Sequence, residues 1–443
     1  MVGAGVSGLA AAVSLARRGI RPLVLEQKPA AGGRSSSFRD SATGDVVDNG
    51  QHVLIAGYHR TIAFLQLIGS NDFLTIQTRP DLLFHHPTRG FRRFTVPSLP
   101  PPFHFGGALL GSNLFSGTDR IRLLRAGFNL MRHSAAETED MTISEWLGTT
   151  GQSPEARRSF WDPLAVSIMN ELPQLAAASP FMRSIRETFL GPWRNACLAL
   201  PVVPLTDLYV RGAIEFIHAR GGEVRCSHDV RRILTEEHRV LGVRMRDGTT
   251  VRSQSVIVSV PPYRLPDLLP SDGETGIDLH GLGQASYSPI VSTHFWFNHE
   301  FMPQQFIGLI GRQTQWVFNR HRIEGNRAPG SHISTVTSAA YDLVDHSNEE
   351  IVTRGLDDLR TVFGSRVGQP YHTVVVREKR ATISLTPAME RIRPSQKTAV
   401  PNLFLAGDWT DTGYPATIEG AVISGESAAG HAVGYLQETL STV

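Results

Sequence analysis

The sequence has few cysteines and no long apolar run, and each shortage excludes a class of protein. Two cysteines among 443 residues, Cys197 and Cys226, exclude a disulfide framework, a CxxC redox pair and a thiolate metal cage. Neither an HExxH motif nor histidines at ligand spacing occur, so we expect no metal. No apolar run reaches the roughly 18 residues of a transmembrane helix, and we expect no signal peptide.

Charge of one sign is also missing. The chain has 43 basic and 41 acidic side chains, a formal charge of +2, which gives no electrostatic basis for binding nucleic acid. Only three of the basic residues are lysines, a bias that we attribute to genomic base composition. The length indicates two or three domains with an ample core. The expected location is the cytoplasm, with contact to the inner face of the cell membrane left open.

The N-terminus carries a glycine motif. Gly3, Gly5 and Gly8 form GxGxxG and open an Ala/Leu-rich helix, which an apolar strand and then Glu26 follow. In a dinucleotide site such glycines let backbone N–H groups approach a pyrophosphate at the positive end of the helix. The carboxylate then accepts hydrogen bonds from a ribose. The alternative is a tight turn in an ordinary α/β protein.

The strand that normally precedes such glycines is short here. Only Met1 and Val2 stand before Gly3, although this strand lies in the middle of the sheet. We hypothesise that the native start lies about five to ten codons upstream, or that the chain is truncated, since a strand usually has about five residues.

Further segments near both ends have matching features. Arg34 follows Ala31-Gly32-Gly33, and the run Asp48-Asn49-Gly50-Gln51-His52 comes next. Near the C-terminus an apolar strand ends in Gly407-Asp408, and a small-residue helix follows it. An Asp at a strand end and a helix start suit a ribityl chain and an electron-rich ring edge. For Asp408 a simple helix N-cap is the alternative.

Together these segments resemble the FAD-dependent amine oxidase and phytoene desaturase superfamily, and within it the hydroxysqualene dehydroxylase family. The residues that carry the second resemblance lie at 48–61, 161–164, 378–382 and 408–421, and the forms at 48–52, 378–382 and 408–421 are the narrower ones. The resemblance implies an α/β fold: a Rossmann-like FAD-binding domain of the glutathione-reductase type, with an interleaved α+β substrate domain of mixed sheet and helices.

The resemblance also implies which residues bind FAD. Five residues hold the ADP half: Gly3, Gly5, Gly8, Glu26 and Arg34, the last through the pyrophosphate. Val230 offers backbone bonds to adenine, and Gly50, Gln51 and His52 pass near the isoalloxazine. The ribityl chain and pyrimidine edge meet Asp408, Thr417, Ile418 and Glu419. No attachment residue lies in the last segment, so we expect non-covalent FAD.

The FAD-binding domain is predicted in three pieces, 1–75, 204–265 and 396–443, with the substrate domain in 76–203 and 266–395. The middle piece indicates a helix over 207–220 and strands over 223–226, 240–246 and 256–260, the last two joined by a turn at Asp247-Gly248. Alternating residues over 291–297 and 332–336 indicate a mixed sheet in the substrate domain.

An apolar loop and a basic amphipathic helix occupy 100–133. The apolar residues Ile121, Leu124, Phe128 and Met131 fall at helical spacing, flanked by arginines. Such a helix could lie in a membrane interface. It could equally cover a substrate tunnel, with its arginines solvated.

The reaction that the resemblance implies is reductive. Hydroxysqualene, a C30 isoprenoid lipid, loses its hydroxyl and gains hydride from reduced FAD, giving squalene and water in squalene and hopanoid biosynthesis. Departure of the hydroxyl requires a general acid. We favour His52 and Asp411 as catalytic residues, ahead of Asp162, Lys379 and Tyr414.

Each of these residues also has a structural alternative. His52 could make a structural hydrogen bond, Asp162 could cap a helix, and Lys379 could form an ion pair. Five aromatic residues could line a tunnel for the polyene or belong to the core of a strand pair: Phe295, Trp296, Phe297, Trp316 and Phe318.

Two rival functions use the same fold. A carotenoid or phytoene-type desaturase would draw hydride from the lipid into oxidised FAD. A lipid-binding protein without redox chemistry would not need the full set of FAD residues. The sequence determines neither the reductant nor the oligomeric state.

Overall fold

A computed structural model describes residues 1–132, 134–270, 272–326 and 329–441. A small parallel sheet lies at the N-terminal end of α1 (Val6–Arg17). Val2 occupies its middle, bridging Leu25 on one side and Val258 on the other. Four strands complete this sheet: β1 (Leu23–Leu25), β9 (Glu223–Arg225), β13 (Val256–Val258) and β19 (Leu403–Leu405).

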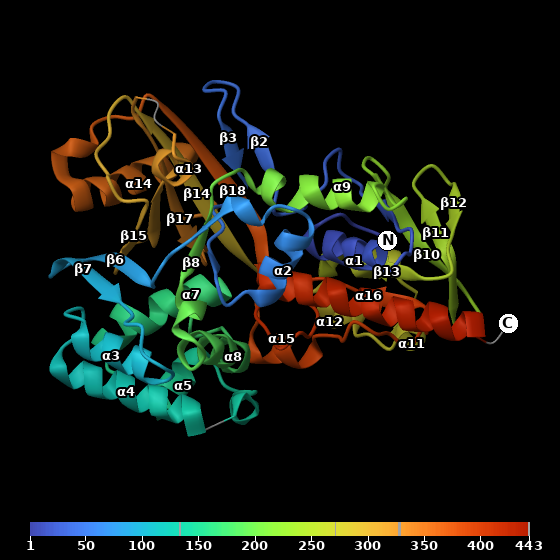
Figure 1. Ribbon diagram of the computed structural model, residues 1–443, viewed down its shortest axis with the longest axis horizontal. Coiled ribbons are helices and arrows are strands. Elements are labelled where there is room, and N and C mark those ends of the chain that lie inside the picture. Colours follow the sequence, from blue (N-terminus) through green and yellow to red (C-terminus); the bar gives the residue numbers. More distant parts are fainter. Residues whose placement is uncertain (133, 271, 327–328, 442–443) are drawn as a thin grey trace.

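The two ends of the chain are joined by a close helix pair. Helix α16 (Ile418–Ser441) packs along α1 beside the parallel sheet (Figure 1). A Cβ on Gly425 would lie 2.2 Å from the carbonyl oxygen of Ser7, so only glycine permits this approach. The glycine motif and the C-terminal segment therefore form one structure.

A seven-stranded mixed sheet forms the second half of the molecule. Helix α14 (Asn348–Phe363) covers one face, which buries Phe295 and Phe297 (Figure 1). In order across the sheet the strands are β18 (His372–Ile383), β14 (Tyr287–Phe297), β17 (Ser331–Ser338), β16 (Trp316–Asn319), β15 (Phe306–Leu309), β6 (Asp81–His86) and β7 (Gly90–Thr95). The mixed sheet expected over 291–297 and 332–336 is confirmed.

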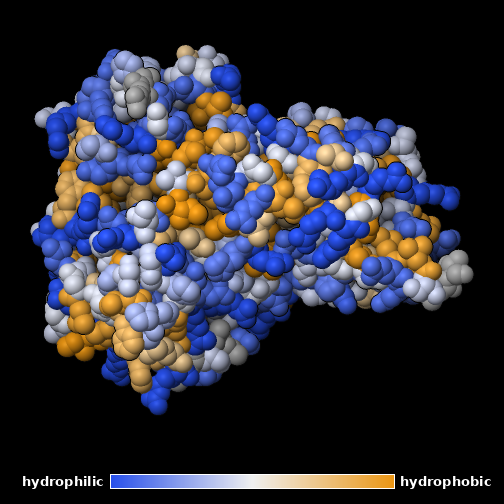
Figure 2. Space-filling model, viewed as in Figure 1, coloured by the Kyte–Doolittle hydropathy of each residue, from blue (hydrophilic) through white to orange (hydrophobic). Residues whose placement is uncertain are grey.

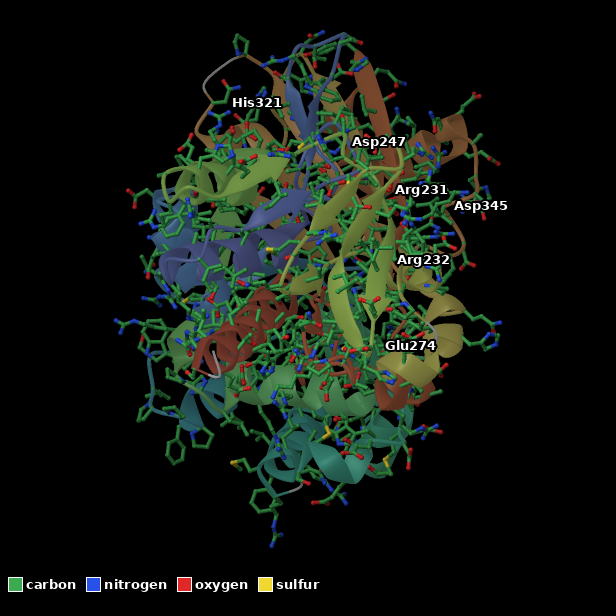
Figure 3. The ribbon with its side chains drawn as sticks, turned by 90° about the vertical axis from the view of Figure 1, so that its right-hand side faces the viewer. Arg231, Arg232, Asp247, Glu274, His321 and Asp345 are labelled. Carbon is green, nitrogen blue, oxygen red and sulfur yellow. The ribbon has the colours of Figure 1, made fainter. Side chains whose placement is uncertain are left out.

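The middle piece of the predicted FAD-binding domain contains two strands that we missed. The turn at Asp247-Gly248 joins β11 (Arg239–Met245) to β12 (Thr250–Arg252), and β10 (Val230–Glu236) completes a separate antiparallel sheet. The expected pairing of 240–246 with 256–260 is wrong, because β13 lies in the parallel sheet beside β19. Figure 3 shows Arg231 and Arg232 on this outer sheet, with Asp247 at its turn.

The predicted helix over 207–220 is divided. A π-helical segment, η5 (Thr206–Arg211), leads into α9 (Gly212–His218). A second π-helical segment, η3 (Arg157–Trp161), precedes α7 (Asp162–Met169). Such segments are frequent at functional sites.

Helices from residues 103–189 form a third layer, at the lower left of Figure 1. An aromatic cluster fills its core, with the rings of Phe105 and Phe189 stacked 4.1 Å apart. The longer helices of this layer are α3 (Phe103–Gly111), α4 (Gly117–Arg132), α5 (Ile143–Thr149) and α8 (Ala178–Phe189).

Helix α4 buries a different face from the apolar stripe seen in the sequence. Leu123, Ala126 and Leu130 are buried, whereas Ile121 and Phe128 are exposed. Figure 2 shows apolar side chains gathered at the lower left, over this part of the molecule. No described helix is both long and apolar enough to cross a membrane.

The remaining elements are short and connect these layers. They are β2 (Ser37–Arg39), β3 (Val46–Asp48), β4 (Leu54–Ile55), α2 (His59–Leu67), η1 (Asn71–Phe73), β5 (Leu74–Ile76), η2 (Ala135–Thr138), α6 (Pro154–Ala156), η4 (Trp193–Ala196), β8 (Leu198–Pro201), η6 (Pro262–Arg264), α10 (Leu265–Leu268), α11 (Asp272–Thr275), α12 (Leu279–Gly283), α13 (Arg320–Glu324), η7 (Gly364–Val367) and α15 (Pro387–Ile392). The division into 1–75, 204–265 and 396–443 against 76–203 and 266–395 stays a prediction.

Candidate active site

One cavity of about 820 Å³ runs between the parallel sheet and the seven-stranded sheet. Its first half is lined by the glycine motif, Glu26, Arg34, the 49–52 loop and the start of α16. Its second half, the apolar arm, is lined by side chains from 80–96, 159–198 and 290–338. A cavity that joins a polar cradle to an apolar tunnel suits a nucleotide cofactor and a lipid.

The glycines build the polar cradle by close backbone contacts. Gly3 has φ +100°, and a Cβ there would lie 2.4 Å from the carbonyl oxygen of Ser259. A Cβ on Gly8 would lie 2.3 Å from the carbonyl oxygen of Gly3. Gly5 has open space beside it and lines the cavity at the N-terminus of α1. A phosphate group can therefore approach the helix N-terminus at Gly5.

Glu26 lies at the expected place beyond β1. Its carboxylate accepts hydrogen bonds from the N–H groups of Ala4 and Lys28, each at 2.9 Å, and it lines the cavity. These bonds fix the carboxylate beside the glycine loop. Val230 lines the cavity from the start of β10, as an adenine contact would.

Arg34 and Asp408 meet across the cavity wall. The Arg34 guanidinium donates to Asp408 Oδ1 at 2.6 Å and to the carbonyl oxygen of Ala381 at 2.6 Å. The Asp408 carboxylate raises the pKa of Arg34 against the lowering effect of burial, which is the largest single influence. The guanidinium stays charged and can bind a pyrophosphate.

Arg393, which the sequence did not single out, holds the loop after β19. Its guanidinium donates to the carbonyl oxygens of Asp408, Thr410 and Tyr414 at 3.2, 2.5 and 2.9 Å. Its side chain is fully buried beside Glu390. Arginines are abundant in this chain, so the sequence contains no signal that distinguishes Arg393 from the others.

Gly50, Gln51 and His52 line the cavity as expected. Gln51 Oε1 accepts from the Arg320 guanidinium at 2.5 Å, and Arg320 also pairs with Glu324. His52 is half-buried, its Nδ1 atom is buried without a hydrogen-bond partner among the described residues, and desolvation lowers its pKa to about 4. The imidazole is therefore neutral at physiological pH, and it can donate a hydrogen bond without being a protonated acid.

Thr417 and Ile418 line the cavity at the start of α16, but the Glu419 side chain points elsewhere. Its carboxylate accepts from the N–H groups of Arg60 and Thr61 and from the Thr61 hydroxyl, at 2.6 to 2.9 Å. Glu419 thus joins α16 to the first turn of α2. Its carboxylate is used in the fold, not on the cavity wall.

Asp411, one of the two favoured acids, does not line the cavity. It is exposed, and its carboxylate accepts from the N–H of Gly413 at 3.0 Å. Tyr414 donates its hydroxyl to Glu187 at 2.5 Å. Neither position supports a role as acid toward a bound lipid.

The other two acid candidates are also placed unfavourably for this role. Asp162 starts α7 outside the cavity lining, and burial raises its pKa. Lys379 lies at the cavity margin, where its ammonium pairs with exposed Asp345 at 2.7 Å. Among the predicted acids, only His52 and Lys379 therefore line the cavity, and only His52 has no ion-pair partner there.

The 378–382 segment forms a bulge in β18. Ser288 pairs with Thr382, while Ile290, two residues on, pairs with Glu378, so the three residues 379–381 stand opposite the single residue 289. All residues from Glu378 to Ile383 line the cavity. Bulges of this kind redirect a strand next to an active site. The motif thus brings the edge of the large sheet against the cofactor cradle.

The aromatic residues proposed as tunnel lining divide between two faces. Trp316 and Phe318 line the apolar arm. Phe295 and Phe297 pack beneath α14, and Trp296 donates to Asp45 Oδ2 at 2.7 Å. Successive side chains of β14 point to opposite faces of the sheet, and α14 packs on one of these faces. The alternating pattern of one strand does not reveal which face a helix covers. No group of metal ligands occurs among the residues that the structure describes.

The model of the flavin containing amine oxidoreductase family matches residues 6–433. The chain belongs to that family. FAD is its cofactor, and the glycine cradle, Glu26 and Arg34 fit this group.

Two kinds of relative match almost the whole chain. A hydroxysqualene dehydroxylase of Rhodopseudomonas palustris is 31% identical over 97% of this chain and 96% of its own length. One from Zymomonas mobilis is 29% identical over 98% and 99%. A 15-cis-phytoene desaturase of Synechococcus elongatus is 22% identical over 97% and 94%.

Solved structures show the same fold. Putrescine oxidase bound to putrescine superimposes with a TM-score of 0.74 at 16% identity, covering 98% of both chains. An oxidoreductase from Methanosarcina mazei gives 0.73 at 17% identity, covering 96% of this chain and 98% of its own. The fold class inferred from the sequence, an α/β FAD-binding fold with a mixed-sheet partner, is confirmed.

Proposed function

We propose that the protein is an FAD-dependent hydroxysqualene dehydroxylase, which removes the hydroxyl of hydroxysqualene to give squalene and water. The observation that carries this proposal is the likeness to hydroxysqualene dehydroxylases along almost the whole chain. The apolar arm supports it, because a C30 isoprenoid needs a long apolar site next to the cofactor. The reaction belongs to squalene and hopanoid biosynthesis.

The chemistry divides between cofactor and protein. FAD, when reduced, supplies the hydride. The residues that would hold it are those of the cradle: Gly3, Gly5, Glu26, Arg34, Gly50, Gln51, Val230, Asp408, Thr417 and Ile418. The apolar arm excludes water from the reacting carbon and holds the lipid skeleton in place.

An anaerobic experiment tests the proposal. The FAD-loaded protein is reduced, hydroxysqualene is added, and flavin absorbance is followed while squalene is assayed. Flavin oxidation matched by squalene formation is the expected result. Bleaching of oxidised flavin by a polyene, without oxidation of reduced flavin by hydroxysqualene, would instead assign the protein to the desaturases.

We also propose that α3 and α4 contact a lipid bilayer. Phe103 and Ile121 are 68% and 69% exposed, and Leu110 and Phe128 are more than half exposed. Exposed arginines flank this surface, as in helices that lie in an anionic membrane interface. Leu114, between the two helices, lines the apolar arm. The same unit can therefore pass lipid from the bilayer to the cavity.

Vesicle flotation tests this surface. Ile121→Ser/Phe128→Ser should lose binding to vesicles that contain anionic phosphatidylglycerol, whereas wild type should bind. Leu241→Ser is the control, because Leu241 is 46% exposed on β11, outside the α3–α4 unit. Equal flotation of wild type and the double variant would contradict the proposal.

A further inference from the structure

The apolar arm contains no ionisable side chain among the described residues that line it from 80–96, 159–198 and 290–338. A hydroxyl within the arm meets only neutral hydrogen-bonding groups, whereas the ionisable side chains of this end of the cavity, among them Tyr287, Glu378 and Lys379, line its junction with the cradle. The polar side chains of the arm are Ser159, Ser167, Asn170, Thr188, Trp316 and Ser338.

Two of these hydroxyls already donate to the protein. Ser159 donates to Glu155 Oε1 at 3.0 Å, and Thr188 donates to the carbonyl oxygen of Ser184 within α8. They cannot donate to a ligand without losing these bonds. The hydroxyl groups that can still donate a hydrogen bond therefore lie on the other side of the arm, where α7 meets β17 and β18.

Ser167 lies on α7, exposed to the cavity. Its Oγ accepts a hydrogen bond from Trp316 Nε1 at 3.0 Å, and no described group accepts its own proton. A hydroxyl that accepts a hydrogen bond is a stronger donor, since the two bonds polarise each other. The Ser167 hydroxyl is thus prepared to donate to an oxygen in the cavity.

Thr382 is arranged in the same way on β18, beside the C-terminal end of α7. Its Oγ1 accepts from the Asn170 amide at 2.9 Å, and no described group accepts its proton. Asn170 ends α7 in the left-handed conformation with φ +47°, which Asn tolerates. Its amide also accepts from the N–H of Ala339 at 3.0 Å, so it is fixed.

This pocket lies where the arm joins the cofactor cradle. Ser167 lies in the last turn of α7, and Asn170 caps the end of this helix three positions later. Thr382 follows Ala381, whose carbonyl oxygen accepts from Arg34 at 2.6 Å. The reacting carbon of a lipid must lie at this junction, because hydride comes from the cradle and the skeleton occupies the arm.

We propose that Ser167 and Thr382 hold the substrate hydroxyl by donating hydrogen bonds to its oxygen, in a pocket completed by Ser338. This inference rests on the proposed function. As the carbon–oxygen bond breaks, its electron pair goes to oxygen and the two donors stabilise that charge. Reduced FAD, held by the cradle, would supply the hydride for the carbon and also the proton with which the oxygen leaves as water, so that alcohol and reduced FAD give hydrocarbon, water and oxidised FAD.

Binding to the oxidised holoenzyme in detergent tests the pocket without turnover. Dissociation constants for hydroxysqualene and squalene come from changes in flavin absorbance. Wild type should bind the alcohol about tenfold more tightly than the hydrocarbon, as one or two hydrogen bonds would give. Ser167→Ala and Thr382→Val should each reduce this preference to about threefold or less, with squalene affinity unchanged.

Conservative variants separate hydrogen bonding from shape. Ser167→Thr and Thr382→Ser keep the hydroxyl and should keep the preference for the alcohol. Ser338→Ala should weaken it, and this variant tests the pocket if another fails to fold. An unchanged preference in the Ala and Val variants, or no preference in wild type, would overturn the inference.

Turnover distinguishes this inference from the proposed function. If wild type prefers the alcohol but reduced enzyme forms no squalene, the proposed function fails and the pocket stands. If squalene forms at equal rates in wild type and in both Ser167→Ala and Thr382→Val, the reaction stands and the pocket is excluded as a catalytic site.

Discussion

Arg34 and Asp408 lie 374 positions apart in the sequence and form an ion pair of 2.6 Å in the structure. Each was expected to bind a different part of FAD, the pyrophosphate and the ribityl chain. Their contact shows that the two ends of the chain meet at one point of the cavity wall. Arg34 also donates to the carbonyl oxygen of Ala381 on β18, and this bond connects the large sheet to the cradle.

Loss of the Arg34 charge should weaken FAD binding. Arg34→Ala is expected to raise the dissociation constant of FAD at least tenfold, because a charge-assisted bond contributes roughly 1.5–3 kcal/mol. Arg34→Lys should recover part of this, since an ammonium lacks the bidentate geometry. Flavin fluorescence during titration of the apoprotein measures the constant. Arg360→Ala is the control, because Arg360 is equally exposed on α14; equal effects of both Ala variants would contradict the assignment.

Glu419 should stabilise the fold through its three hydrogen bonds to α2. Glu419→Gln is expected to lower the free energy of unfolding by about 1–3 kcal/mol, because one acceptor oxygen is lost in a buried site. Urea unfolding followed by circular dichroism measures it. Glu426→Gln, which removes the partner of largely exposed Arg60, should cost less than about 1 kcal/mol. A larger loss in Glu426→Gln would refute this account of the helix junction.

Local motifs were predicted well from the sequence, and side-chain directions were not. Gly3, Gly5, Glu26, Arg34 and the 50–52 loop line the cavity, because each lies within a few residues of the strand or helix end that positions it, whereas Gly8 packs against Gly3. Asp411 and Glu419 stand next to cavity residues in sequence, yet their side chains turn to other partners. Which way a side chain turns depends on neighbours that are distant in sequence.

The same reason explains the misassigned hairpin and the unrecognised arginines. Strand β12 has only three residues, too few for an alternating pattern, so 256–260 was chosen as the hairpin partner instead. Arg320 and Arg393 are recognisable only through the carbonyl and amide oxygens that they contact. A single sequence contains no trace of those contacts.

His52 should contribute stability at neutral pH that is lost on acidification. Its pKa is lowered by burial to about 4, so between pH 4 and the ordinary value of 6.5 the unfolded chain binds the proton and the folded chain does not. Stability from this residue is therefore complete above pH 6.5 and falls by up to about 1.4 kcal/mol per pH unit below it. Urea unfolding at pH 5, 6 and 7 should show a smaller pH dependence in His52→Gln than in wild type. An equal dependence would mean that folding does not lower the pKa of His52.

The glycine cradle offers a test that separates folding from cofactor binding. Gly5→Ala places its Cβ in open cavity space, so the apoprotein should keep its stability while FAD affinity falls at least tenfold through loss of the close phosphate approach. Gly8→Ala places its Cβ 2.3 Å from the carbonyl oxygen of Gly3, so the apoprotein itself should be destabilised. Thermal unfolding of the apoproteins and titration with FAD measure the two effects.

A matched glycine on α16 completes that comparison. Gly430→Ala meets no atom within 4 Å, so it should leave FAD affinity unchanged and raise stability slightly, by at most about 1 kcal/mol, as expected for Ala in a helix. If Gly5→Ala binds FAD as tightly as Gly430→Ala does, the phosphate does not pass Gly5. If Gly5→Ala instead loses stability without FAD, as Gly8→Ala should, then Gly5 is required for the turn itself and the cradle must be assigned to other backbone groups.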